Sequence, residues 1–114
     1  GFYCPATPNV IYGNRSMPDW NMTYAPAAGV RHELSHHAIH MRCGTIEPEA
    51  IMQNGVNRTE GVTNSYAVKY MGANRALIQQ SIDYAASTGR KQDRMDAFTD
   101  RAAERIHSGQ CNAG

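Results

Sequence analysis

The chain has 114 residues, which is enough for one domain and too few for two, because a domain usually needs about 100 to 150 residues. Its 11 basic and 10 acidic side chains give a net charge of +1, without the basic stripe that binding to a nucleic-acid backbone requires. No apolar run approaches the roughly 20 residues of a membrane-spanning helix. We therefore expect a single domain over residues 1–114, with no nucleic-acid partner and no transmembrane segment.

The N-terminal quarter of the chain reads as loop and short strand. Val10-Ile11-Tyr12 is the one β-favouring run among the first 24 residues, and turn-forming pairs bound it on both sides. A helix is predicted from Ala25, because Pro26 suits a first turn and apolar residues then recur until Gly44.

The rest of the chain predicts further helices separated by short breaks. They are a single turn over Glu47–Met52 that Asn54-Gly55 should end, a helix from near Thr59 to about Gly72, a helix over Arg75–Ser87, and a helix over about Gln92–His107. The sequence therefore predicts an α+β fold, mostly helical, with a small sheet near the N-terminus.

The chain contains three cysteines, Cys4, Cys43 and Cys111, which is too few for a disulfide-dense scaffold. We expect one disulfide and one free thiol, and the sequence leaves the pairing open. Because the chain starts at Gly1 instead of a methionine, we expect it to be a processed or trimmed product. The expected location is secreted or extracytoplasmic.

Four of the five histidines lie between residues 32 and 40, and the segment His32-Glu33-Leu34-Ser35-His36 has the pattern H-E-x-x-H. On a helix, His32 and His36 lie one turn apart on one face, where both can reach a Zn²⁺ ion at about 2.0 to 2.1 Å. Glu33 lies roughly 100° further round the helix, where it could act as general base on a metal-bound water. Leu34 and Ala38 beside the motif favour a buried helix.

A catalytic zinc site needs a third protein ligand. His40 is excluded, because it lies eight residues, or about 12 Å, along the helix from the first histidine. Glu60, on the next long predicted helix, is the strongest candidate, and Glu47 and Glu49 are the alternatives. Asn64, one turn after Glu60, could accept a hydrogen bond from a ligating imidazole and so fix its tautomer.

This pattern resembles the glutamate-helix branch of the zincin metallopeptidases. More narrowly, it resembles the neutral zinc metallopeptidase family of bacteria, which reads F-Y-C-P, then a short strand, then H-E-x-G-H-H. The matching segments are Phe2-Tyr3-Cys4-Pro5, Val10-Ile11-Tyr12, His32-Glu33-Leu34-Ser35-His36-His37, and the closing pattern of Arg94 to Phe98, Gly109 and Cys111.

The resemblance implies a zincin-like domain that hydrolyses peptide bonds of peptide or protein substrates with a Zn²⁺ cofactor. The expected oligomeric state is a monomer. His32, His36 and Glu60 match the family's metal ligands, and Glu33 matches its general base. The chain departs from the family at Ser35, where glycine is usual, and at Asn64-Ser65, where Asp-Cys is usual. An asparagine would orient an imidazole without lending it negative charge.

The oxyanion of peptide hydrolysis needs a further hydrogen-bond donor. Tyr66 and Tyr70 are the candidates on the helix of Glu60, and Tyr24 and His107 are also possible. Spacing does not rank them.

Two other kinds of protein fit the same residues. The first is a non-catalytic zinc-binding module, with the fourth metal position closed by His37, His40 or Cys43. The second is a metal-free interaction protein on a zincin scaffold. A nucleobase deaminase is disfavoured because its H-x-E and P-C-x-x-C signature is missing, and nothing marks a cysteine as an activated nucleophile.

Overall fold

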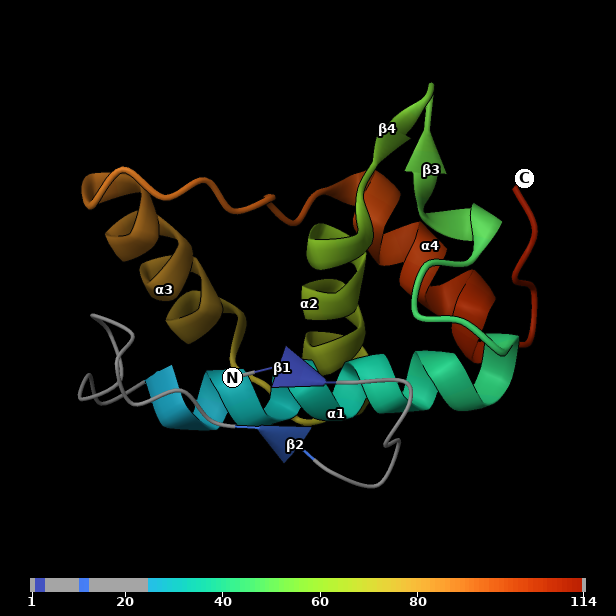
Figure 1. Ribbon diagram of the computed structural model, residues 1–114, viewed down its shortest axis with the longest axis horizontal. Coiled ribbons are helices and arrows are strands. Elements are labelled where there is room, and N and C mark those ends of the chain that lie inside the picture. Colours follow the sequence, from blue (N-terminus) through green and yellow to red (C-terminus); the bar gives the residue numbers. More distant parts are fainter. Residues whose placement is uncertain (1, 4–10, 13–24, 114) are drawn as a thin grey trace.

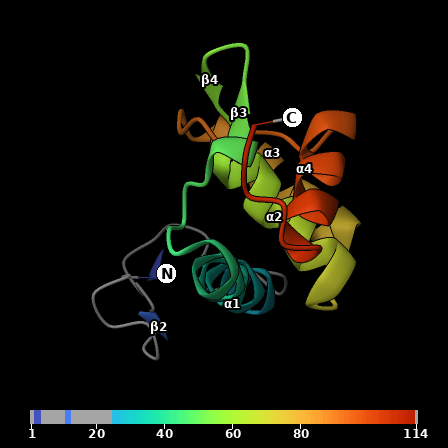
Figure 2. The same cartoon turned by 90° about the vertical axis from the view of Figure 1, so that its right-hand side faces the viewer.

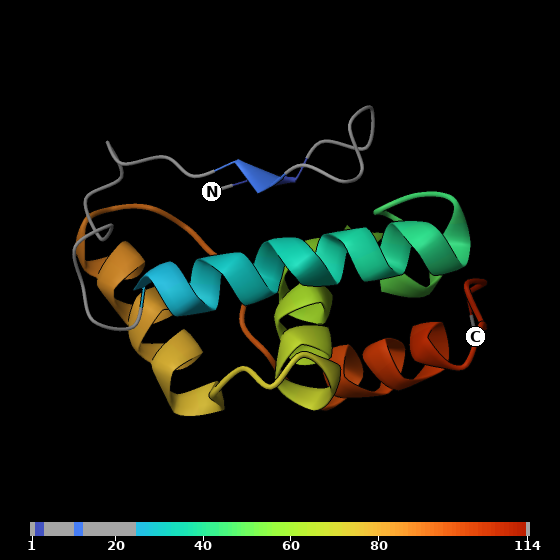
Figure 3. The ribbon, with the colours of Figure 1, turned by 90° about the horizontal axis from the view of Figure 1, so that it is seen from below.

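The computed structural model describes residues 2–3, 11–12 and 25–113. Strands β1 (Phe2–Tyr3) and β2 (Ile11–Tyr12) pair antiparallel, with Phe2 opposite Tyr12. Both strands lie on the side of helix α1 that faces away from the other helices (Figure 3). This confirms the small N-terminal sheet that the sequence predicts.

Helix α1 (Ala25–Cys43) is the long helix on which the rest of the fold is built. It ends at Gly44, whose φ of +74° suits glycine and whose N–H donates to the carbonyl of His40 at 2.8 Å. The bounds agree with the predicted helix. Ala38 is buried as expected, but Leu34 is 38 % exposed, because it projects outside the buried face formed by residues such as Ser35 and Ile39.

The segment after α1 differs from the sequence prediction. A short 3₁₀ helix (η1) covers only Glu49–Ile51, and Met52 already belongs to strand β3 (Met52–Gln53), which pairs with β4 (Val56–Asn57). The predicted helical turn over Glu47–Met52 is therefore wrong at both ends. Asn54 and Gly55, with φ of +50° and +80°, form the tight turn of this hairpin.

Three more helices follow: α2 (Thr59–Tyr70), α3 (Arg75–Ser87) and α4 (Ala97–His107). The first two agree with the predicted positions. The last begins at Ala97 and not near Gln92, because Asp96 caps it: its side chain accepts from the Thr99 N–H at 3.1 Å, and the Thr99 hydroxyl accepts from the Asp96 N–H at 2.8 Å.

Helix α2 is the centre of the described fold. It packs across α1 on one side and against α4 on another, with α3 further along α1 (Figures 1 and 2). Residues 61–67 of α2 are all buried. The main core gathers apolar side chains from α1, η1, α2 and α4, among them Ile39, Ile51, Val62 and Ile106. A smaller cluster joins Ala67 of α2 to Ile78 and Ile82 of α3.

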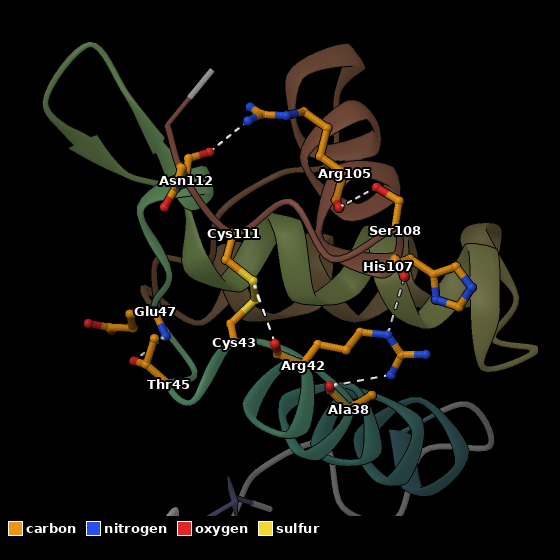
Figure 4. The surroundings of a disulfide bond; sticks show 10 residues. All are labelled: Ala38, Arg42, Cys43, Thr45, Glu47, Arg105, His107, Ser108, Cys111 and Asn112. Atoms are coloured by element: carbon orange, nitrogen blue, oxygen red, sulfur yellow. Dashed lines mark hydrogen bonds between the residues drawn. A yellow bond between two sulfur atoms is a disulfide. The ribbon is translucent and has the colours of Figure 1, made fainter.

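A disulfide joins Cys43, the last residue of α1, to Cys111 in the C-terminal tail (Figure 4). The Cys111 carbonyl also accepts a hydrogen bond from the N–H of Ala50 at 3.0 Å, so the tail is held against η1 as well. The expected single disulfide is present, while Cys4 lies outside the described residues. Because Cys43 is oxidised, it is not available as the thiolate that would close a structural zinc site.

None of the described helices combines the length and the apolar character needed to cross a membrane.

Candidate metal centre

Helix α1 supplies two imidazoles to one point on its surface. His32 and His36, one turn apart, have ring centroids 4.6 Å apart and rings nearly perpendicular at 88°. His36 is buried, with 6 % of its surface exposed, and His32 is partly buried. The helical period places both rings on the side of α1 that α2 crosses.

Helix α2 brings a carboxylate to the same point. Glu60, in the first turn of α2, has Oε2 2.8 Å from His32 Nε2 and Oε1 3.6 Å from His36 Nε2. One possible ligand atom of each of these three residues lies within 4.8 Å of those of the other two. Among the described residues, these three form the group that could hold a metal ion. Two donors each about 2.1 Å from a tetrahedral ion lie about 3.4 Å apart. His36 and Glu60 are close to this spacing, and the hydrogen-bonded pair of His32 and Glu60 would need to open slightly around Zn²⁺, so the donor set fits this ion.

Asn64 fixes the orientation of the first imidazole. Its Oδ1 lies 2.7 Å from Nδ1 of His32, and an amide oxygen is an acceptor, so Nδ1 is the donor. Asn64 follows Glu60 by one helical turn, and both side chains therefore face α1. With Nδ1 protonated, the Nε2 atom of His32 is the one directed at Glu60.

The carboxyl group of Glu33 is buried beside this cluster. Only 4 % of the residue is exposed, and its Oε2 has no hydrogen-bond partner among the described residues. Burial raises the pKa of Glu33 above its ordinary value, although the charge of His32 opposes the shift. A buried carboxyl with an oxygen that has no partner among the described residues, and with a raised pKa, accepts a proton more readily than an exposed glutamate.

The two histidines differ in how readily they hold a proton. Burial disfavours a charged His32, but the hydrogen bond and charge of Glu60 outweigh it and raise the pKa of His32 above 6.5. Burial and the neighbouring charge of His32 lower the pKa of His36 to about 4. The pKa of Glu60 is lowered, since its contacts with His32 and His36 outweigh the effect of burial. His36 is therefore a neutral imidazole at pH 7.

The alternative ligands stay away from the cluster. Glu47 and Glu49 are exposed on the connection that follows α1, and the backbone N–H of Glu47 donates to the Thr45 hydroxyl at 3.1 Å. Neither these two residues nor His37 and His40 belong to the group of converging donors within the described ranges.

The two tyrosines of α2 considered as oxyanion donors both contact His107 of α4. The Tyr66 hydroxyl is 2.9 Å from Nδ1 of His107 on α4, and the Tyr70 ring stacks on His107 with centroids 3.8 Å apart. Tyr66 is 1 % exposed, and Arg42 at the far end of α1 lies 5.8 Å from its ring centroid. The geometry therefore gives Tyr66, Tyr70 and His107 a packing role together, and Tyr24 lies outside the described residues.

Sequence reasoning missed Arg58, the residue directly before α2. Its guanidinium is 4 % exposed and binds two carboxylates, of Asp93 at 2.8 Å and Asp96 at 2.9 Å. Both partners lie more than 30 residues away in the sequence, so no local pattern could have revealed the contact.

Comparison with known proteins does not extend these observations: no family model, no curated protein and no solved structure matches the chain.

Proposed function

We propose that this protein is a zinc-dependent peptidase of the H-E-x-x-H type. The observation that supports the proposal most is the convergence of His32, His36 and Glu60, from two helices, with one possible ligand atom of each within 4.8 Å of the others. When bound, Zn²⁺ would lower the pKa of a coordinated water toward about 7 and polarise the carbonyl of the scissile bond.

Residues of the chain itself supply the metal ligands and hold them in place. His36 is neutral and offers a lone pair without first losing a proton. Asn64 holds His32 with Nε2 directed at the site of the ion, and the carboxylate of Glu60 completes the donor set. Two imidazoles and one carboxylate leave a net charge on the ion, as hydrolytic zinc sites do.

Glu33 is the general base in this proposal. It takes a proton from the attacking water and passes it to the leaving amine. Its burial, its oxygen without a partner among the described residues, and its raised pKa favour this role over that of an ordinary surface glutamate. These features also favour an enzyme over a non-catalytic zinc module, which has no need of a poised carboxyl group.

The test combines metal analysis with peptide cleavage for the wild type, Glu33→Gln, Glu60→Ala and Glu104→Ala. Glu104 is the matched control, because its side chain is 53 % exposed and ion-paired to Lys69, compared with 56 % exposure for Glu60. We expect Glu33→Gln to keep the metal and to lose activity by about 10²- to 10⁴-fold. Glu60→Ala should bind metal more weakly, and Glu104→Ala should resemble the wild type.

Other results would favour the alternatives. A wild type that binds zinc but cleaves no peptide of a broad library would be a non-catalytic zinc-binding module. A wild type without affinity for zinc would be an interaction protein on this scaffold. Unchanged zinc affinity in Glu60→Ala would remove Glu60 from the ligand set.

A further inference from the structure

Arg58 is a buried cation at the start of α2. Its Nε donates to Asp93 Oδ2 at 2.8 Å and its Nη2 to Asp96 Oδ2 at 2.9 Å. The remaining nitrogen, Nη1, donates to Gln53 Oε1 at 2.5 Å, and Nη2 also reaches the carbonyl of Arg94 at 3.2 Å. One side chain thereby joins the β3–β4 hairpin, the segment before α4 and the cap of α4 to the first residue before α2.

The backbone of Arg58 is fixed as well. Its N–H donates to the carbonyl of Ile51 at 3.1 Å, and its own carbonyl accepts from the N–H of Val62 at 2.9 Å. The second bond is the first i→i+4 hydrogen bond at the start of α2. Both the side chain and the backbone of the residue directly before α2 are therefore held by their contacts.

The first turn of α2 also makes a close contact with the segment before α4, at Gly61. A Cβ atom at Gly61 would lie 2.5 Å from Asp93 Oδ2 and 2.9 Å from Thr99 Cγ2, and it would also overlap the carbonyl of Arg94. Only glycine allows the segment that holds Asp93 to lie this close. Asp93 thus contacts both Arg58 and the backbone beside Glu60.

Glu60 lies between these two anchored residues. Its side chain is 56 % exposed, and its ion-pair contacts are with His32 and His36. Because so much of the side chain is in solvent, packing around it does little to fix its place. The backbone of the first turn of α2 must do so, and Arg58 and Gly61 fix that backbone.

We propose that Arg58 is a positioning residue that holds Glu60 at the metal centre. This inference rests on the proposed zinc site. It differs from a general contribution of Arg58 to stability, because it requires the effect of Arg58 on the metal to pass through Glu60. A loss of ligand placement of this kind typically weakens metal binding by about 10- to 100-fold.

A second polar network on α2 provides the matched control. Asp100 of α4 accepts from the Ser65 hydroxyl at 2.7 Å and from Arg75 Nη2 at 3.0 Å. It ties α2 to α3 and α4 as Arg58 ties α2 to its neighbours, but its contact on α2 is five residues beyond Glu60. Asp100→Asn should therefore lower stability without moving Glu60.

The experiment measures Zn²⁺ and Co²⁺ dissociation constants, the visible absorption spectrum of the Co²⁺ form, and the unfolding midpoint of the metal-free full chain. The variants are Arg58→Met, Arg58→Lys and Asp100→Asn, with Asp93→Asn as a milder change should Arg58→Met fail to fold. We expect Arg58→Met or Asp93→Asn to weaken metal binding at least about tenfold and to alter the Co²⁺ spectrum. Arg58→Lys, which keeps the charge, should recover part of the affinity, and Asp100→Asn should leave affinity and spectrum unchanged.

A double-mutant cycle with Glu60→Ala decides whether the effect passes through Glu60. In the Glu60→Ala background, Arg58→Met should weaken Co²⁺ binding no further, because the positioned ligand is already gone. An equal fold-loss in both backgrounds, or a loss with Asp100→Asn as large as that with Arg58→Met, would overturn the role of Arg58 and leave the metal centre intact. A wild type that binds neither ion would overturn both proposals.

Discussion

Histidines lie in different surroundings at the middle of α1 and at its C-terminal end. Near the middle, His32 and His36 meet the carboxylate of Glu60, and one possible ligand atom of each lies within 4.8 Å of the others. At its C-terminal end, near the disulfide, His107 meets the hydroxyl of Tyr66 and the ring of Tyr70. A histidine is thus a candidate ligand where its ring nitrogen shares a point with other donors. Where the ring nitrogen instead bonds to a tyrosine hydroxyl, as in His107, the histidine contributes to packing.

The two regions are also held together by different means. The disulfide end of α1 is closed by the covalent bond between Cys43 and Cys111. The candidate metal centre at the middle of α1, formed by His32, His36 and Glu60, has no such covalent bond among the described residues, and we propose that it depends on the buried guanidinium of Arg58. We therefore expect changes at the disulfide end to alter stability and changes at the candidate metal centre to alter metal affinity.

The largest predicted effect is at the disulfide end. Replacing Cys43 and Cys111 together by serine should lower the free energy of unfolding by about 4 kcal/mol, because the bond closes a loop with a sequence separation of 68 residues. Urea unfolding of the metal-free protein measures this. Zinc affinity under conditions where the variant is folded should match the wild type. A parallel fall in zinc affinity would show that the disulfide end and the candidate metal centre are coupled.

The next effect is at the candidate metal centre. Asn64→Ala should weaken zinc binding by about 10- to 100-fold, because His32 Nδ1 loses the acceptor that orients the ring. Asn74→Ala is the control, since Asn74 caps α3 by accepting from the Leu77 N–H at 3.2 Å. It should cost about 1 kcal/mol of stability and leave zinc affinity unchanged. Competition titration with a chelating indicator distinguishes the two, and equal affinities would remove Asn64 from the site.

The pH dependence of zinc binding should reflect the loss of one proton, that of His32. The pKa of His32 is raised above 6.5, so at about pH 6 His32 is protonated in the metal-free protein, and the ion must displace that proton. The pKa of His36 is about 4 and that of Glu60 is lowered, so neither competes there. Affinity should fall about tenfold for each pH unit below the pKa of His32 and level off above it. Calorimetry in buffers of different ionisation enthalpy counts the protons, and two released at about pH 6 would contradict this assignment.

The smallest effect should come from Tyr66. Tyr66→Phe removes the hydrogen bond to His107 and should cost about 1 kcal/mol, because His107 is exposed and can bond to water instead. Thermal unfolding measures this cost, with Tyr70→Phe, which keeps the stacked ring, as control. Any peptidase kcat should be unchanged. A loss of about 10²- to 10³-fold in kcat without loss of stability would restore Tyr66 as the oxyanion donor.

The sequence was sufficient for features that depend on local pattern. Helix α3 lies at Arg75–Ser87 as predicted, since an apolar stripe follows a capping asparagine. The end of α1 at Gly44 and the start of α2 at Thr59 also follow from local signals. Asn54-Gly55 lies beyond the end of the helical turn before it, as the sequence predicts, and it is also a strong signal for a tight hairpin turn, which is the role it has between β3 and β4.

Features that depend on distant contacts were beyond sequence reasoning. Tyr66 follows Glu60 by six residues, or about 240° around the helix, so the two side chains point in different directions. Which partner Tyr66 meets depends on where α4 lies. The start of α4 is set by the Asp96 cap, whose carboxylate also binds Arg58 from the other side of the fold. The pairing of Cys43 with Cys111 likewise follows from the position of the tail against η1.

The exposure of Glu60 has a practical consequence for handling the protein. With more than half of this side chain in contact with solvent, chelating agents in a lysis or storage buffer would reach an ion held by Glu60, the proposed third ligand. The zinc content of a purified sample would then depend on the buffers in which the protein had been kept. Dialysis against a chelator followed by stepwise return of zinc would give a defined starting point for each measurement above.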